Sequence, residues 1–197
     1  MCKLSLSWGC FMVFYSSAYA AEYSPAEFHR NVYLLHQQQI AQHAVRTEQE
    51  KGDYAGAAAA GYSYLDIRYY DAANGHLLSH VRRDASKPEL IHIVEVNIYQ
   101  NDKLVRDFGS VSLPWMPLRP VRTFINLHQY NEQLHSFRQY DITGQIGYEF
   151  CEGSWKGEPV KISLDDADIN ASNSSSEVYQ NCFKDLNPNW AQYKIPH

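Results

Sequence analysis

Residues 90–113 have the sequence LIHIVEVNIYQNDKLVRDFGSVSL, which predicts two β-strands and the turn that joins them. Alternate positions of the first half carry side chains that suit one buried face: His92, Val94, Val96 and Ile98. This alternation is the pattern of a strand with one side packed on a core. Asn101-Asp102 then favours a two-residue hairpin turn. We therefore expect residues 90–100 and 103–113 to be neighbouring antiparallel strands.

The same pattern continues on both sides of this hairpin. Aromatic and β-branched residues separated by turn sequences favour strands. The expected further strands are 63–70, 76–82, 121–130, 133–140, 145–152 and 158–164. Residues 62–197 are thus predicted to form an antiparallel β domain, a strongly twisted meander of about seven to nine strands that could curl into a half-barrel.

A helix is expected before the sheet. Ser24-Pro25-Ala26-Glu27 is a capping box with proline at the first helical position. Good helix formers continue to Lys51, and Gly52 supplies a stop, which predicts about seven turns. Residues 55–60 are either a short second helix or a close-packed linker. Residues 21–61 are therefore the predicted helix and linker, and the fold class is α+β.

The first twenty residues resemble an export signal. Lys3 precedes an apolar run at 4–15, and the segment closes on the small-residue pattern Ala18-Tyr19-Ala20. Residues 1–20 are accordingly predicted to be a signal peptide that is removed, which makes the protein periplasmic or secreted. The apolar run is too short to span a bilayer, and no transmembrane segment is expected in the mature chain.

Two cysteines remain after removal of that segment, Cys151 and Cys182. In an oxidising compartment they are expected to form a disulfide that ties the C-terminal loop to the sheet. A thiol nucleophile and a two-cysteine metal site are the alternatives, but neither a CxxC spacing nor a nearby histidine supports them.

The charge of the chain argues against nucleic acid as a partner. Its formal net charge is −5, and its basic residues form no cluster beyond Arg82-Arg83. Binding a polyanion requires a basic face.

Three histidines on the first helix, His29, His36 and His43, recur every seven residues and share one side. Neighbours in this row are about 10 Å apart along a straight helix, too far to share one metal ion. We expect these rings to pack against the sheet.

A second pair of histidines is a candidate metal site. If Asn131-Glu132 forms a two-residue hairpin loop, His128 lies directly opposite His135. Cross-strand neighbours are close enough to share a zinc or copper ion. The alternative is an ordinary pair of polar side chains on a solvated sheet face.

A candidate calcium loop lies near the C-terminus. Its ligand positions would be Asp166, Asp168, Asn170 and Glu177, with the spacing of an EF-hand loop. Ala171 replaces the glycine that the sharp turn of such a loop requires. A polar loop that leads into a short helix through Cys182, capped by Asp168 or Ser176, explains the same residues.

No serine elbow, Walker loop, Rossmann fingerprint or HExxH helix is present in the sequence. The first functional hypothesis is an exported binding or structural protein. Its aromatic sheet face would suit a protein, a peptide or a small apolar ligand, with no cofactor. The second is an envelope protein that binds a divalent metal or calcium, and the third is a hydrolase of unrecognised type.

Overall fold

The computed structural model of the chain describes residues 24–56, 60–131, 133–165 and 176–186. One open sheet of nine antiparallel strands contains every strand of these ranges, and each strand pairs with the next in sequence. The strands are β1 (Val45–Asp53), β2 (Ser63–Asp71), β3 (Leu77–Asp84), β4 (Ile91–Gln100), β5 (Lys103–Leu113), β6 (Met116–Asn131), β7 (Leu134–Tyr140), β8 (Ile146–Trp155) and β9 (Glu158–Asp165). The described ranges also contain two helices, α1 (Pro25–Gln42) and α3 (Glu177–Phe183). The predicted α+β class, a helix packed on an antiparallel meander, is confirmed.

Helix α1 begins where the capping box predicts. The Ser24 hydroxyl accepts a hydrogen bond from the Glu27 backbone N–H at 3.2 Å, and the Glu27 carboxylate accepts from the Ser24 backbone N–H at 3.1 Å. These bonds satisfy backbone donors that the first helical turn leaves free. No helix within the described ranges is long and apolar enough to cross a membrane.

The predicted end of this helix, at Lys51, is wrong. Helix α1 ends at Gln42, His43 is its extended C-cap, and Val45–Asp53 forms strand β1. All nine residues of β1 pair with β2. Helix propensity is a weak preference, and a continuous ladder of backbone hydrogen bonds overrides it here. Because β1 is an edge strand that is exposed along most of its length, its sequence shows no alternation of apolar and polar residues.

The turn residues predicted their local structure more accurately than the helix formers did. Asn101 and Asp102 have φ angles of 49° and 60° and join β4 to β5 as predicted. Lys156 and Gly157, with φ angles of 53° and 86°, join β8 to β9, so the turn is shorter than the expected 153–157. Positive φ values match the right-handed twist of the strands that such turns connect.

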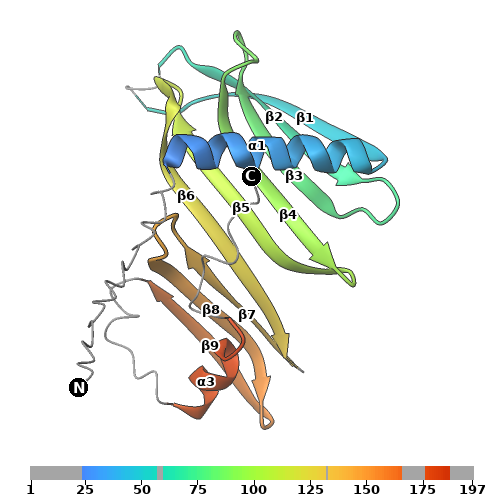
Figure 1. The fold of residues 1–197 in the computed structure, drawn as a ribbon, viewed down its shortest axis with the longest axis vertical. Helices are drawn as coiled ribbons and strands as arrows, with labels where there is room; N and C mark the ends of the chain where they lie inside the picture. Colours follow the sequence, from blue (N-terminus) through green and yellow to red (C-terminus); the bar gives the residue numbers. More distant parts are fainter. Residues whose placement is uncertain (1–23, 57–59, 132, 166–175, 187–197) are drawn as a thin grey trace, which may run out of the picture.

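Both helices lie on the same face of the sheet. Helix α1 crosses β3–β6, and α3 packs at β6 and β7 near the other end of the molecule (Figure 1). The core lies between the helices and this face, and its fully buried side chains include Phe28, Val32, Val81, Val94 and Ile125. Strand β6 is long enough to contribute to both the α1 end and the α3 end (Figure 1).

The predicted disulfide is confirmed. Cys151 on β8 and Cys182 on α3 are joined with an S–S distance of 2.11 Å, and both are buried. The cross-link closes a loop with a sequence separation of 31 residues. A chain-entropy argument credits such a loop with about 3–4 kcal/mol of stability. Residues 1–20 and 57–59 lie outside the described residues, so the signal peptide and the nature of the linker stay predictions.

Candidate functional site

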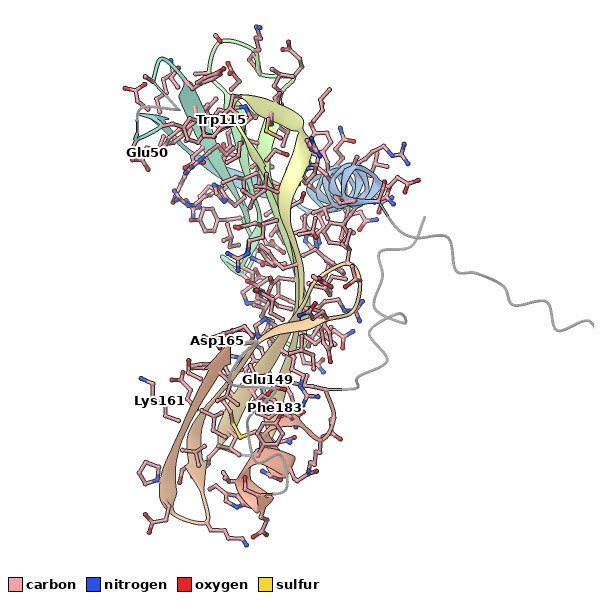
Figure 2. All side chains as sticks on the ribbon, turned by 90° about the vertical axis from the view of Figure 1, so that its left-hand side faces the viewer. Glu50, Trp115, Glu149, Lys161, Asp165 and Phe183 are labelled. Atoms are coloured by element: carbon pink, nitrogen blue, oxygen red, sulfur yellow. A yellow bond between two sulfur atoms is a disulfide. The ribbon has the colours of Figure 1, made fainter. Side chains whose placement is uncertain are left out.

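We call the face of the sheet opposite α1 and α3 the open face, because no helix of the described ranges packs on it. Lys161 of β9 projects to the side away from α3, whereas Phe183 lies on the helix side (Figure 2). Because strand side chains alternate between faces, every second residue of each strand belongs to the open face. The strand register therefore assigns its residues.

Three cross-strand rows of side chains cover the open face from β6 to β9. They are Tyr130, His135, Glu152 and Lys161; His128, Phe137, Phe150 and Ser163; and Asn126, Gln139, Tyr148 and Asp165. Aromatic rings concentrate in the centre. Phe137 lies 5.3 Å from the His128 ring, 5.5 Å from Phe150 and 5.6 Å from Tyr148, measured between ring centres. The result is a half-buried aromatic cluster.

A hydrogen-bonded chain of three side chains borders this cluster. Asp107 Oδ2 lies 2.8 Å from His128 Nε2, and His128 Nδ1 lies 3.2 Å from His135 Nε2. Asp107 comes from β5, His128 from β6 and His135 from β7. Asn126 donates a further hydrogen bond to Asp107 Oδ1 at 2.7 Å, which fixes the carboxylate.

The two imidazole rings meet edge to edge. Their planes differ by 7°, and their centres are 5.5 Å apart. This separation exceeds the 3.2 Å between the nitrogens by about the sum of the two ring radii, which is the largest excess that the two rings allow. Each nitrogen therefore points straight at the other, as in a linear N–H···N hydrogen bond. Shared metal ligands would instead converge at an angle on a point about 2 Å from each.

The hydrogen-bond partners decide the tautomers of neutral rings. An ionised Asp107 can only accept, so Nε2 of His128 carries the hydrogen of that bond. Nδ1 of His128 then accepts from Nε2–H of His135. The remaining nitrogen, Nδ1 of His135, is left as an acceptor, and none of the described residues donates a hydrogen bond to it.

His135 faces an open groove of about 530 Å³ at the end of this sheet segment. Lys103, Tyr130, Glu152 and Lys161 line the groove with it. The Tyr130 ring stacks on His135 with centres 4.6 Å apart, and the Lys103 ammonium lies 5.1 Å from the Tyr130 ring. Burial, and to a smaller extent the neighbouring His128, lower the pKa of His135 below 6.5. The site therefore presents a neutral hydrogen-bond acceptor beside aromatic surface.

A second polar network lies on the open face nearer to β1. The two oxygens of Asp66 accept from Nε and Nη2 of Arg82 at 2.8 and 2.7 Å. His80 bridges Asp66 Oδ1 at 2.9 Å and Glu95 Oε2 at 3.2 Å. Two carboxylates and two basic groups are thus internally paired. Burial opposes protonation of His80, but its bonds to Glu95 and Asp66 outweigh this and raise its pKa above 6.5. This network is a structural feature of the sheet.

The predicted contact between His128 and His135 is present, but the predicted register is wrong. His128 pairs with Phe137 and His135 pairs with Tyr130, so the two histidines are diagonal neighbours. The pairing differs by two residues along one strand, which keeps both side chains on one face because strand periodicity is two. In the described part of the chain, no group of three or more His, Cys, Asp or Glu side chains is arranged to hold a metal. A metal held by the histidine pair itself stays a prediction.

Most of the predicted calcium loop cannot be placed. Asp166, Asp168 and Asn170 lie outside the described residues. Glu177 is the first residue of α3, and both of its carboxylate oxygens accept from the Lys156 ammonium, at 2.7 and 2.8 Å. The short helix through Cys182 is present, and Ser176 is its N-cap.

The helical histidine row packs against the sheet, as predicted. Nδ1 of His29 lies 3.0 Å from Ser110 Oγ, and Nδ1 of His36 lies 2.7 Å from Ser79 Oγ. His43 contacts Asp71 Oδ2 at 2.9 Å. Burial and the nearby Arg83 lower the pKa of His36 to about 4. His29 and His36 therefore pack between the helix and the sheet, whereas His43, the exposed C-cap, contacts only the end of β2.

Sequence reasoning missed Asp107 and the aromatic cluster around Phe137. Asp107 reaches His128 only through the register of β5 on β6, which contains two irregularities near Ser112. That register could not be counted from the turn. A usable signal was the alternation of aromatic and polar residues in 121–130 and 133–140, which marks a second, non-core face.

Comparisons with models of protein families, with curated proteins and with solved structures found nothing that matches this chain. The function is therefore inferred from the residues of the site itself.

Proposed function

We propose that this chain is an exported binding protein whose open face docks a partner protein. The observation that carries the proposal is the aromatic cluster of Tyr130, His135, Phe137, Tyr148 and Phe150 on the uncovered side of the sheet. Aromatic side chains offer a large contact area at a small entropic cost and are enriched in protein interfaces.

The surroundings of the cluster favour a protein over a small apolar ligand. Small ligands usually bind in concave pockets that enclose most of their surface. The groove at His135 is open, and charged Lys103, Glu152 and Lys161 are among the residues that line it. An aromatic centre with a charged rim is the usual arrangement of a protein–protein contact.

The hydrogen-bonded chain from Asp107 to His135 gives this surface one hydrogen-bond acceptor with a fixed orientation. Asp107 orients His128, which orients His135, so Nδ1 of His135 is held as an acceptor next to the Tyr130 ring. A partner that places an apolar side chain on the cluster and an N–H or O–H donor on His135 would satisfy both features. The Cys151–Cys182 disulfide supports an oxidising compartment for this encounter.

Site-specific photo-crosslinking in the producing cells tests the proposal. A photoreactive phenylalanine analogue replaces Phe137 in one variant and exposed Leu34 of α1 in a control variant. We expect one protein adduct at Phe137 and none at Leu34. The identified partner should then bind the purified wild type at least about tenfold more tightly than Phe137→Ser, the effect of removing one interface anchor.

Two results would contradict this function. The first is an absence of any adduct specific to Phe137 in a variant that melts like the wild type. The second is an identified partner that binds Phe137→Ser and Tyr130→Ala as tightly as the wild type.

A further inference from the structure

We infer that the tip of the β5–β6 hairpin inserts into a lipid bilayer surface that carries anionic headgroups. Four large hydrophobic residues of the described chain are exposed, and three of them lie within seven residues at this tip: Trp115, Leu118 and Val121, with exposed fractions of 41%, 80% and 52%. Isolated exposed hydrophobics are normal, whereas a cluster marks an interaction site.

These side chains lie where the pairing of β5 with β6 is irregular. Leu113 pairs with Met116, but Ser112 pairs with Pro120, so residues 117–119 have no partner on β5. The next pair is Val111 with Arg122, which leaves Val121 unpaired as well. Bulges of this kind redirect side chains away from the positions that a regular ladder dictates. Leu118 and Val121 thus belong to bulges and not to the core.

The backbone of the tip suits an environment that forms few hydrogen bonds. Pro114, Pro117 and Pro120 carry no N–H, so each removes a donor that would need a partner within the bilayer. Their fixed φ angles also limit the entropy that insertion would cost. Trp115 lies beside Tyr62, with ring centres 6.4 Å apart, near the upper end of the molecule (Figure 2). Trp and Tyr are the residues enriched at membrane–water interfaces.

Charge favours an anionic surface as the occupant. The whole chain has a net charge of −5, yet residues 108–131 contain no Asp or Glu and carry Arg119 and Arg122. Both arginines are exposed next to the apolar side chains. Arginine can keep its guanidinium at the headgroups while its stem and its neighbours enter the apolar layer. An apolar pocket of another protein would explain the hydrophobic residues but not this local reversal of charge.

Vesicle flotation of the full-length chain tests the inference. Vesicles of phosphatidylcholine alone are compared with vesicles that also contain phosphatidylglycerol, at low and at physiological salt. We expect preferential binding to the anionic vesicles, weakened by salt. The variant Leu118→Asp/Val121→Asp should bind about tenfold less or weaker still, because two apolar anchors are lost. Leu34→Asp, at an exposed position on α1, is the matched control and should bind like the wild type.

A local readout separates the tip from any other apolar segment of the chain. The emission of Trp115 is obtained as the difference between the wild type and Trp115→Phe. Anionic vesicles should shift this difference spectrum to the blue. Equal vesicle binding by the wild type and the double Asp variant, no vesicle binding at all, or an unshifted Trp115 spectrum would each overturn the inference. The last two results would leave a protein pocket or a second copy of the chain as the occupant.

Discussion

Histidines buried between helix and sheet differ from the carboxylate-bound histidine of the open face in how readily they take up a proton. On the helix-covered face, His29 and His36 meet the hydroxyls of Ser110 and Ser79, and burial lowers the pKa of both. On the open face, His80 lies between two carboxylates, and its pKa is raised. Histidine is therefore expected to be neutral between helix and sheet and to hold a proton more readily where two carboxylates bind it. His135, on the open face but hydrogen-bonded to His128 and not to a carboxylate, also has a lowered pKa.

Desolvation explains the difference. A charge in the space between a helix and a sheet loses its hydration, so a neutral imidazole with one hydroxyl partner is the more stable form there. On the open face, carboxylates can stabilise an imidazolium while water remains near. The comparison predicts that substitutions on the covered face cost much stability and that equivalent ones on the open face cost little.

The largest difference in the free energy of unfolding should be found between alanine substitutions of two phenylalanines, one on each face. Phe28→Ala empties a fully buried site between α1 and the sheet and should lower the free energy of unfolding by about 3–5 kcal/mol. Phe137→Ala removes a half-buried ring from the open face and should cost less than about half of that. Urea denaturation of both variants measures the difference. Equal losses would mean that the open face is also covered.

Alanine substitutions of two glutamates, one on each face, should differ almost as strongly in the stability that they cost. Glu149 is fully buried on the covered face, where it pairs with Arg138 and accepts from the Tyr179 hydroxyl at 2.7 Å. Glu149→Ala leaves Arg138 buried without its partner and should cost about 3–5 kcal/mol. Glu95, which is 42% exposed on the open face, pairs with His80, and Glu95→Ala should cost less than about 1 kcal/mol. Thermal unfolding of the two variants provides the comparison, and a larger cost for Glu95 would refute it.

Acid should destabilise the protein through His36. Its pKa is about 4 in the folded state and 6.5 in the unfolded chain, so between these values only the unfolded chain takes up the proton. The stability that His36 provides is complete above pH 6.5 and falls by roughly 3 kcal/mol as the pH drops to 4. Urea titrations at several pH values should show a shallower acid loss for His36→Gln. An unchanged slope in this variant would assign the effect to other groups.

His80 should make the smallest contribution to stability, and this contribution should change with pH in the opposite direction to that of His36. Because its folded pKa is raised, its contribution is complete below pH 6.5 and is lost as the pH rises through the folded pKa. Part of this network is exposed, so the contribution should not exceed about 1 kcal/mol. His80→Gln should therefore be less stable than the wild type at pH 6 and nearly equal to it at pH 9. A deficit that grows toward high pH would contradict this assignment.

Local chemistry predicted much of the fold. Ser24 and Glu27 predicted the start of α1, Asn101-Asp102 predicted a hairpin, and Cys151 and Cys182, the two cysteines beyond the predicted signal peptide, were predicted to bond. Each of these features needs only residues that are adjacent in the chain or a single possible partner. The predictions for the end of α1 and for strand β1 were wrong, because helix formers such as Glu48 and Lys51 continue past Gln42, whereas the strand partner of this segment lies in β2.

The candidate site was accessible to sequence reasoning only in part. Because side chains alternate between the two faces of a strand, the predicted hairpin placed His128 and His135 on one face. The observed register differs by two residues and therefore keeps both side chains on that face. Asp107 could not be found, because its position depends on bulges in the β5–β6 pairing. Nor did the pattern of the chain reveal that both helices of the described ranges would pack on one face of the sheet and neither on the face that carries Phe137.

The sequence by itself indicated most of the alternation of strand and turn, the first turn of α1 and the pairing of Cys151 with Cys182. Short-range backbone preferences suffice for the first two, and the predicted removal of Cys2 and Cys10 left one pairing for the third. Only the tertiary structure decided where α1 stops, in which direction the pKa values of His36 and His80 shift, and which face of the sheet the helices of the described ranges leave uncovered. Those properties depend on contacts between residues far apart in the chain, and on the water that such contacts exclude.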